Sequence, residues 1–430
     1  MFPLRARFRA VAASAPRAYW VVWWGTLINR LGGFVVPLMT IYLTTERGVT
    51  VTEAGAAVSA FGAGQVLASI AGGQLADRVG RRVTMLISLF SGAVVMTVLG
   101  TLTDLAAITV TVGVLGFAGE LYRPAVAAFV SDVIPEGERL QAYGLLYWAV
   151  NLGWGFAATV GGLIAKADFH LLFVADAATM AAFGVLIAVA VPETRPAPVR
   201  AADAPPLPAT RAWWRDRPFA TFVGINFLLV LLPLQSGAAL SAHMTAQGFS
   251  PAAYGLVLGC NGLFIIVAQP VLTARIARAD ADRVLVVSAV LYGIGMGVHG
   301  LASILVAHIA AVMIWTTAEI LESPTRSALV AAMAPADARG RYQGAFVMTW
   351  GAGQLVAPRL GTLVWDRAGP RALWFGCVGL GMFVALALAA TARDRRVRVA
   401  AAVRATLDGE GAGDRQRVAR DREALVTPPG

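Results

Sequence analysis

The sequence predicts an all-α membrane protein in which twelve transmembrane helices form two pseudo-symmetric six-helix bundles. Hydrophobic residues make up 57% of its 430 residues and charged residues only 14%, whereas soluble proteins carry about 25% charged residues. Several apolar runs reach the roughly 20 residues that a helix needs to cross a bilayer. Because these runs are long and do not alternate with polar residues, a membrane β-barrel is excluded.

The chain also repeats itself at an offset of 200 residues. The segment 144–162, GLLYWAVNLGWGFAATVGG, aligns without gaps with 344–362, GAFVMTWGAGQLVAPRLGT. The same shift brings together Pro124 and Pro324, Pro135 and Pro335, Arg139 and Arg339, and Gly48, Gly55 and Gly62 with Gly248, Gly255 and Gly262. An ungapped register over this distance indicates two structurally equivalent halves.

The first helix is expected at 19–44, an apolar run that is too long for the hydrophobic part of a signal peptide. The eleven further helices are expected at 53–75, 84–102, 106–133, 140–165, 171–191, 218–245, 252–274, 284–302, 305–333, 342–364 and 371–392. Glycine and alanine are frequent in these runs, and small residues let helix backbones approach closely in lipid.

The helices divide the chain into five parts. We expect a cytoplasmic segment at 1–18, bundles at 19–191 and 218–392, a cytoplasmic linker at 192–217 and a cytoplasmic tail at 393–430. The linker is rich in proline and charge, as connecting segments are. The tail is polar and lacks apolar periodicity, so we predict that it is disordered.

The formal net charge of +10 comes from arginines that concentrate in the termini, the linker and alternate loops. This is the positive-inside distribution of membrane proteins, so it places both termini in the cytoplasm and gives no reason to expect nucleic-acid binding. Arginines of the tail can also contact anionic lipid headgroups. We expect a multi-pass protein of a bacterial plasma membrane.

The sequence offers no recognisable catalytic or metal site. A nucleotide-binding P-loop needs a lysine followed by Ser or Thr, and the single lysine, Lys166, is followed by Ala167. The histidines form no HExxH pattern, and no GxSxG occurs. Cys260 and Cys377 lie far apart in apolar runs, which implies neither a disulfide nor a metal pair. We therefore expect no enzyme activity, no cofactor and no metal.

The loop after the second helix, 73–82, reads GQLADRVGRR. Its glycines, its acid and its basic residues are Gly73, Asp77, Arg78, Gly80, Arg81 and Arg82. This loop resembles the signature loop of the major facilitator superfamily, which lies at the same place between helices two and three. The resemblance implies that Asp77 locks the two halves together on the inner side. The alternative is a purely topological loop with an incidental acid. The equivalent loop of the second half has Ala277 instead, so the lock would act from one half only.

The fifth helix carries a second pattern, made of Gly144, Gly153, Gly161 and Gly162. Its spacing resembles the antiporter motif of that superfamily, and the alternative is a generic glycine-packed helix. Ala157-Ala158 stands where the motif has Gly-Pro, which removes a proline bend and leaves the direction of transport open.

The resemblance covers residues 19–392 and is closest to the drug:proton antiporters. It implies the major facilitator fold and proton-coupled, drug-like efflux of small amphipathic compounds by alternating access. The implied partners are a small-molecule substrate, protons and membrane lipids, and we expect a monomer. Import of a small metabolite and lipid translocation are the alternatives.

Charged residues inside the predicted helices are the best indicators of a site, because each is costly at mid-membrane if unpaired. In the tenth helix Trp315, Glu319, Glu322 and Arg326 recur at helical spacing on one face. Arg326 can pair with Glu322 at i+4 and keep it ionised. Two carboxylates this close resist being ionised together. Glu319 has no such neighbour and is therefore the predicted proton carrier.

The remaining candidates come from other helices. Glu120 is the alternative proton carrier, and Asp176 is a weaker candidate for which a hydrated structural role is favoured. Families of this kind line their cavity with helices one, four, seven and ten, so the resemblance implies that Arg30 meets Glu120 there, with a fixed ion pair as the alternative. Further cavity candidates are Asn29, Tyr122, Arg123, Gln235, His243 and Trp315.

Overall fold

The computed structural model describes residues 15–135, 138–194, 213–276, 279–335 and 339–401. These residues are almost entirely helical and include no strand. Eleven helical segments in them are long and apolar enough to cross a membrane. The longest, Tyr342–Ala390, is two helices joined at Gly369, where φ of 84° departs from helical geometry. The predicted twelve membrane spans are thereby confirmed.

The first bundle consists of α2 (Arg17–Leu31), α3 (Val35–Glu46), α4 (Val51–Val79), α5 (Arg81–Thr101), α6 (Leu105–Glu120), α7 (Tyr122–Val133), α8 (Arg139–Ala167) and α9 (His170–Ala190). The second consists of α10 (Arg217–Val230), η3 (Pro233–Ser236), α11 (Ala238–Ala246), α12 (Pro251–Ile276), α13 (Ala281–His299), α14 (Leu305–Met333) and α15 (Arg339–Ala390), preceded by η2 (Trp213–Arg215). Two helices form the first span (α2 and α3) and two the fourth (α6 and α7).

Helix boundaries repeat at the predicted offset of 200 residues. The starts of α2, α4, α5, α6 and α8 correspond to those of α10, α12, α13, α14 and α15. The interruption between α2 and α3 also recurs between α10 and α11. Side-chain caps help to fix these starts, as when the Asp104 carboxylate accepts a hydrogen bond from the Ala107 N–H at 2.8 Å.

The two bundles contact each other through two equivalent helix crossings. In one, Gly55 of α4 lies against α15, and a Cβ there would come within 2.1 Å of Thr362 Oγ1. In the other, Gly255 of α12 lies against α8, and a Cβ there would come within 2.1 Å of the Ala158 carbonyl oxygen. The helices therefore meet almost backbone to backbone, as small residues allow in membranes.

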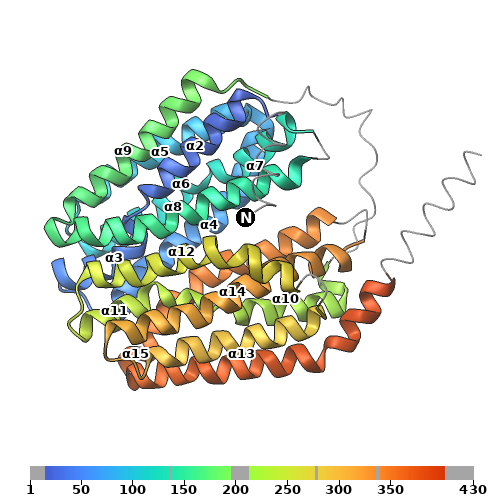
Figure 1. The fold of residues 1–430 in the computed structure, drawn as a ribbon. Helices are drawn as coiled ribbons and strands as arrows, with labels where there is room; N and C mark the ends of the chain where they lie inside the picture. Colours follow the sequence, from blue (N-terminus) through green and yellow to red (C-terminus); the bar gives the residue numbers. More distant parts are fainter. Residues whose placement is uncertain (1–14, 136–137, 195–212, 277–278, 336–338, 402–430) are drawn as a thin grey trace, which may run out of the picture.

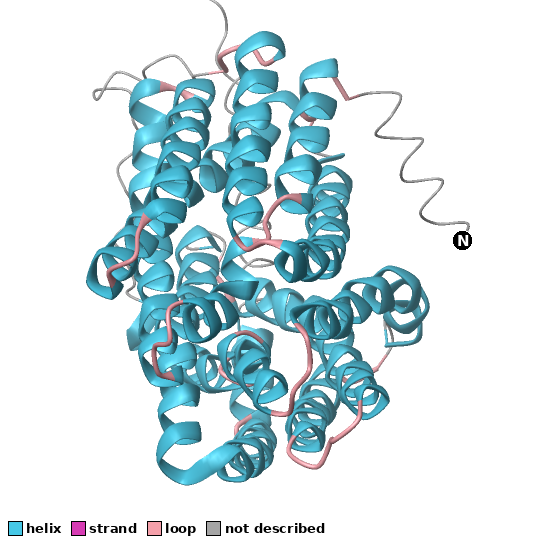
Figure 2. Ribbon diagram, turned by 90° about the vertical axis from the view of Figure 1, so that its left-hand side faces the viewer, coloured by secondary structure: helices cyan, strands magenta, loops and turns pink. Residues whose placement is uncertain are grey.

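The bundles lie close together at one end of the molecule and diverge at the other (Figure 1), and Figure 2 views the molecule from the end where they meet. We call the diverging end, where α9 ends and α10 begins, the linker end, and the opposite end the far end. The crossings at Gly55 and Gly255 belong to the far end, since both lie near the start of their helices. The backbones of the two bundles are thus in contact at the far end and lie further apart at the linker end (Figure 1).

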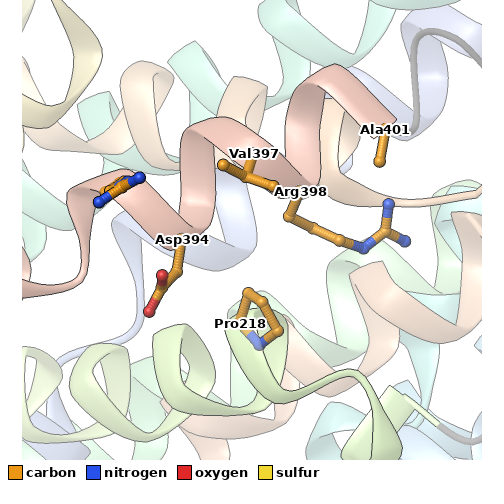
Figure 3. A pocket seen from close by; sticks show the side chains of 6 residues that line it. Pro218, Asp394, Val397, Arg398 and Ala401 are labelled. Carbon is orange, nitrogen blue, oxygen red and sulfur yellow. The ribbon is translucent and has the colours of Figure 1, made fainter.

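The structure corrects the predicted boundary of the tail. The chain remains helical over residues 392–401, where the sequence predicted a disordered segment from residue 393. Arg395 explains the order, because its side chain is 1% exposed and pairs with Asp282 at 2.6 Å. A helix anchored by a charged residue has no apolar periodicity to reveal it. A pocket of about 250 Å³ lies between this helix and Pro218 of α10 (Figure 3). Residues 1–14, 195–212 and 402–430 lie outside the described residues.

Candidate functional site

One group of charged side chains lies in α14 of the second bundle. Arg326 Nε lies 2.8 Å from Glu322 Oε2, so the ion pair expected from their i, i+4 spacing is present. Tyr292 donates a hydrogen bond to Glu322 at 3.4 Å. Arg326 also donates to Asn226 of α10 at 2.7 Å, and its guanidinium lies over the Phe346 ring. Glu322 is therefore buried in an ion pair with Arg326, and each of the two side chains has a further hydrogen bond.

Glu319 of the same helix has a different partner. Its carboxylate accepts a hydrogen bond from Asn261 Nδ2 of α12 at 3.0 Å. The same amide donates to Thr316 Oγ1 at 2.9 Å, which fixes its orientation. Glu319 is only partly buried. It is thus held by a neutral amide, whereas Glu322 is held by a guanidinium.

A second group lies in the first bundle, where the structure brings Arg30 and Glu120 together as predicted. Arg30 Nη2 lies 3.6 Å from Glu120 Oε1, and Arg123 Nη1 lies 2.9 Å from Glu120 Oε2. Tyr122 accepts hydrogen bonds from Arg30 at 2.8 Å and from Asn29 at 3.4 Å. Two guanidiniums therefore share one carboxylate.

The other predicted residues lie in separate environments. Asp176 is buried and accepts a hydrogen bond from the Val35 N–H at 3.3 Å, at the start of α3. Gln235 is buried and donates to the Leu231 and Ala357 carbonyls. Trp315 is buried in the hydrophobic core. These three side chains are held by contacts within one bundle each.

His243 belongs to a buried histidine cluster at the far end. It contacts the His299 carbonyl oxygen at 3.1 Å, and His299 Nδ1 lies 2.9 Å from His308 Nδ1. The Gln247 amide hydrogen-bonds with His243 Nε2 at 3.1 Å and with His308 Nε2 at 2.9 Å. Within the part of the chain that the structure describes, no group of three or more His, Cys, Asp or Glu side chains could hold a metal ion.

The loop 73–82 is ordered by contacts within its own bundle. Asp77 is 73% exposed and pairs with Arg81 at 3.0 Å, and Arg81 also pairs with Asp132 at 3.1 Å. The Glu193 carboxylate accepts from the Arg81 backbone N–H at 2.7 Å. Gly80 has φ of 110°, and a Cβ there would lie 2.3 Å from Glu193 Oε2, so the turn needs glycine for two reasons. A Cβ at Gly73 would have nothing within 4 Å of it. The Arg82 side chain donates a hydrogen bond to the Ala188 carbonyl, and Arg78 lies in the last turn of α4.

Three of the four glycines in the α8 pattern make close contacts. A Cβ at Gly153 would lie 2.5 Å from Arg30 Cβ, and one at Gly161 would lie 3.0 Å from the Phe34 ring. A Cβ at Gly162 would lie 2.5 Å from the Pro251 carbonyl oxygen in the other bundle. At Gly144, a Cβ would have nothing within 4 Å of it. The pattern therefore packs α8 on both bundles.

Sequence reasoning missed several residues that hold these sites together. Gln65 donates to Glu120 at 3.3 Å, and Asn261 and Asn226 hold Glu319 and Arg326. All three are amides in otherwise apolar helices. A polar side chain in such a place predicts a hydrogen-bond partner inside the bundle, so the sequence did indicate them. Glu193 had no such signal, because it stands in the proline-rich linker.

The chain matches known proteins over nearly its full length. The family model described as Major Facilitator Superfamily matches residues 22–236 and 236–425. An uncharacterized MFS-type transporter of Bacillus subtilis is 24% identical over 361 residues, which cover 83% of this chain and 91% of the relative. A Na(+), Li(+), K(+)/H(+) antiporter of Planococcus maritimus is 24% identical over 389 residues, which cover 82% of this chain and 89% of the relative.

A shorter match and two solved structures complete the comparison. The quinolone resistance protein NorA of Staphylococcus aureus is 27% identical over 143 residues, which cover 33% of this chain and 36% of the relative. A POT family transporter in complex with a thioalcohol-conjugated peptide superposes with a TM-score of 0.76 at 16% identity, covering 88% of this chain and 97% of that one. The nucleoside transporter NupG superposes with a TM-score of 0.71 at 15% identity, covering 86% of this chain and 99% of that one. With its family model matched across both bundles, its signature loop in place and its fold shared, the chain belongs to the Major Facilitator Superfamily.

Proposed function

We propose that this transporter exports small amphipathic compounds in exchange for protons, by alternating access. The observation that carries the proposal is Glu319, a partly buried carboxylate inside a membrane helix that a neutral amide holds. Ionisable groups at such depth mark ion and substrate pathways. Relatives named as an antiporter and as a quinolone resistance protein support the same assignment.

Glu319 can gain and lose a proton without breaking an ion pair, since Asn261 can remain bonded to either form of the carboxyl group. Protonation removes a charge that is costly to enclose between the bundles. A protonated Glu319 therefore makes closure at both ends easier, whereas Glu322 and Arg326 stay paired throughout. Reopening towards lower proton concentration releases the proton, and the restored carboxylate attracts a cationic group of the substrate.

We assign the linker end to the cytoplasm and both termini to the same side, because the arginines concentrate there. The described conformation is then the inward-open state of a monomer in a bacterial plasma membrane. The outward-open state would close the linker end and part the crossings at Gly55 and Gly255.

The test is a substrate screen in proteoliposomes with an imposed pH gradient. We expect some amphipathic amines to move against their own gradient when protons flow the other way, and to stop moving when a protonophore collapses the gradient. Movement in the same direction as the protons would instead identify an importer. Activity that follows lipid headgroups and no aqueous solute would identify a lipid translocator.

A second candidate is exchange of monovalent metal cations for protons. The antiporter of Planococcus maritimus, which aligns with 82% of this chain, carries that activity in its name. Sodium or potassium gradients in the same proteoliposomes test it directly. Proton flux driven by either cation, without any organic compound, would favour this candidate.

A further inference from the structure

The two groups of charges carry opposite net charge. In the first bundle, Arg30 and Arg123 share the single carboxylate of Glu120, which leaves one positive charge in excess. In the second, Arg326 pairs with Glu322 and Asn261 holds Glu319, which leaves one negative charge in excess when both acids are ionised.

The other nearby acid, Asp176, does not pair with Arg123 in the described contacts. Asp176 is the buried carboxylate that interacts with Arg30 from α9. It accepts a hydrogen bond from the Val35 N–H, at the start of α3. A helix start carries a partial positive charge that attracts a carboxylate. Among the described residues Asp176 forms no ion pair with Arg30 or Arg123, so Glu120 is the carboxylate that pairs with Arg123.

The internal repeat does not account for the charges. At the offset of 200 residues, Arg123 corresponds to Ser323, Glu120 to Ile320 and Glu322 to Tyr122. Each half therefore folds with uncharged residues at the positions where the other half has charges. Since the fold does not require them, their opposite signs in the two bundles need another reason.

In each bundle one charged side chain of the group is accessible. Arg123 has a side chain that is 49% exposed within a membrane-spanning segment, a position that lipid does not tolerate. Its equivalent, Ser323, interacts with Tyr147 of the other bundle, so this position on the helix is directed across the molecule. Glu319 interacts with Tyr147 as well and is partly exposed.

Arg123 and Glu319 lie at similar depths. Ser323, which corresponds to Arg123, comes four residues after Glu319 on α14. Four residues of helix rise about 6 Å. Arg123 therefore lies about one helical turn nearer the linker end than Glu319, on the opposite bundle.

We propose that the substrate is a zwitterion, with a carboxylate that binds Arg123 and an ammonium group that binds Glu319. The inference rests on the proposed function, since it names the substrate class of that same site. A compound with both charges compensates both sites, whereas a cation leaves Arg123 unmatched and an anion leaves Glu319 unmatched. Unmatched charges oppose binding, so the site selects through both attraction and rejection.

The experiment compares three forms of one probe, a zwitterionic fluoroquinolone. Its ethyl ester lacks the carboxylate, and its N-acetyl derivative lacks the ammonium group. Binding to the purified full-length chain in detergent at neutral pH is measured by titration calorimetry. Since a hydrogen bond to a charged group contributes more than a neutral one, we expect the zwitterion to bind about tenfold tighter than either derivative.

Variants assign the two ends. Arg123→Gln should reduce the ratio of the two affinities, zwitterion over ethyl ester, to near one. Arg123→Lys should keep that ratio. Glu319→Gln should reduce the ratio of the affinity for the zwitterion to the affinity for its N-acetyl derivative. Arg371→Gln, an exposed arginine at the start of the last span, is the matched control and should leave both preferences as they are. Size-exclusion profiles confirm that each variant folds.

Equal binding of the zwitterion and its ester to the unmodified chain would overturn the inference, as would the absence of binding by all three probes. An Arg123→Gln chain that keeps the full preference for the acid would also overturn it. Binding needs no proton gradient, so the two proposals can fail separately. If the zwitterion is preferred but no pH gradient drives its movement, proton-coupled export is wrong and the substrate class stands.

Discussion

Glu319 and Glu322 lie three residues apart on α14 yet differ in what holds them. Glu322 has a guanidinium at 2.8 Å and a tyrosine hydroxyl at 3.4 Å, and it is almost fully buried. Glu319 has the amide of Asn261 at 3.0 Å. A carboxylate in a fixed ion pair supports the fold, whereas a carboxylate bonded to an amide can change its protonation state. The two residues should therefore respond differently to the same substitution.

Glu319→Gln should fold and still bind substrate, about tenfold more weakly because the ammonium group loses its carboxylate, and it should lose transport driven by a pH gradient because glutamine cannot carry the proton. Uptake into proteoliposomes with and without a gradient measures the loss. Exchange of labelled for unlabelled substrate, which needs no net proton movement, should persist and serves as the control. If Glu319→Gln transports normally down a pH gradient, the proton carrier is another residue, and Glu120 is the next to replace.

Glu322→Gln should chiefly impair stability, because it leaves Arg326 buried without its anion. Removing one partner of a buried pair costs roughly 3–5 kcal/mol. Thermal unfolding in detergent measures the effect. The double variant Glu322→Gln with Arg326→Gln removes both charges and should recover part of the loss. A double variant less stable than the single one would show that Arg326 stabilises the bundle without Glu322.

The sequence predicted two kinds of contact: those between residues of one helix, and those between helices that the family resemblance places together. The Glu322–Arg326 pair follows from i, i+4 spacing, and the meeting of Arg30 with Glu120 followed from the helices that line such cavities. Asn261 escaped prediction because nothing in the spacing of α14 tells how α12 is rotated against it. His243 was expected in the cavity, but the break at η3 sets the rotation of α11 and places it in the histidine cluster.

At the scale of helices, the C-terminal helix 392–401 is a separate element docked on the second bundle. Arg395 is buried against Asp282 at the start of α13. Arg398 pairs with Asp216 at 2.6 Å, and Asp216 also accepts from Tyr342 at 2.7 Å. The helix therefore connects the linker ends of α10, α13 and α15, and Figure 3 shows it beside Pro218 of α10. The sequence could not reveal it, since charged anchors resemble an ordinary solvated tail.

Arg395→Ala should destabilise the second bundle, because it leaves the Asp282 carboxylate buried without its principal partner. We expect a loss of roughly 3–5 kcal/mol, as for other broken buried pairs. Arg396 is the matched control, since its side chain is 60% exposed and pairs with the same carboxylate at 2.8 Å. Arg396→Ala should leave the melting temperature nearly unchanged. Equal effects of the two variants would mean that the helix is not anchored through Arg395.

The glycines of α8 allow a second test at this scale. Gly162→Ala should weaken closure of the far end, because a Cβ there would lie 2.5 Å from the Pro251 carbonyl oxygen of the other bundle. Gly144→Ala is the matched control, since nothing lies within 4 Å. It should be neutral or stabilising by about 1 kcal/mol through helix propensity. Spin-label distances across the far end should increase in the first variant and stay constant in the second.

At the scale of the whole molecule, twelve spans and two halves were predictable because hydropathy and an ungapped repeat are properties of the chain itself. The conformational state was not, because the same sequence must form both states of the cycle with similar free energy. In the described state Asp77 pairs within its own loop, at 73% exposure, and the far end is closed. The lock that the resemblance implies for Asp77 would bring its carboxylate to the start of α15 in the other bundle, and we expect that contact only in the state in which the linker end is closed.

Asp77→Asn should shift the population towards the state that is open at the linker end. A carboxylate at a helix start stabilises by roughly 0.3–1 kcal/mol, which corresponds to a shift of about two- to fivefold. The modification rate of a cysteine at Ser327, with Cys260 and Cys377 replaced, reports accessibility from the linker end. Asp104→Asn, which keeps a good cap at the far end, is the control. An unchanged rate at normal expression would contradict the lock.

The amide that holds Glu319 also has an electrical consequence. Asn261 fixes the carboxylate without cancelling its charge. If one proton crosses on Glu319 while a zwitterion of zero net charge crosses the other way, each cycle moves one positive charge inward. The membrane voltage then drives the cycle together with the pH difference, and 100 mV contributes about 2.3 kcal/mol per charge. A bacterium at neutral external pH could therefore run this exporter on voltage alone.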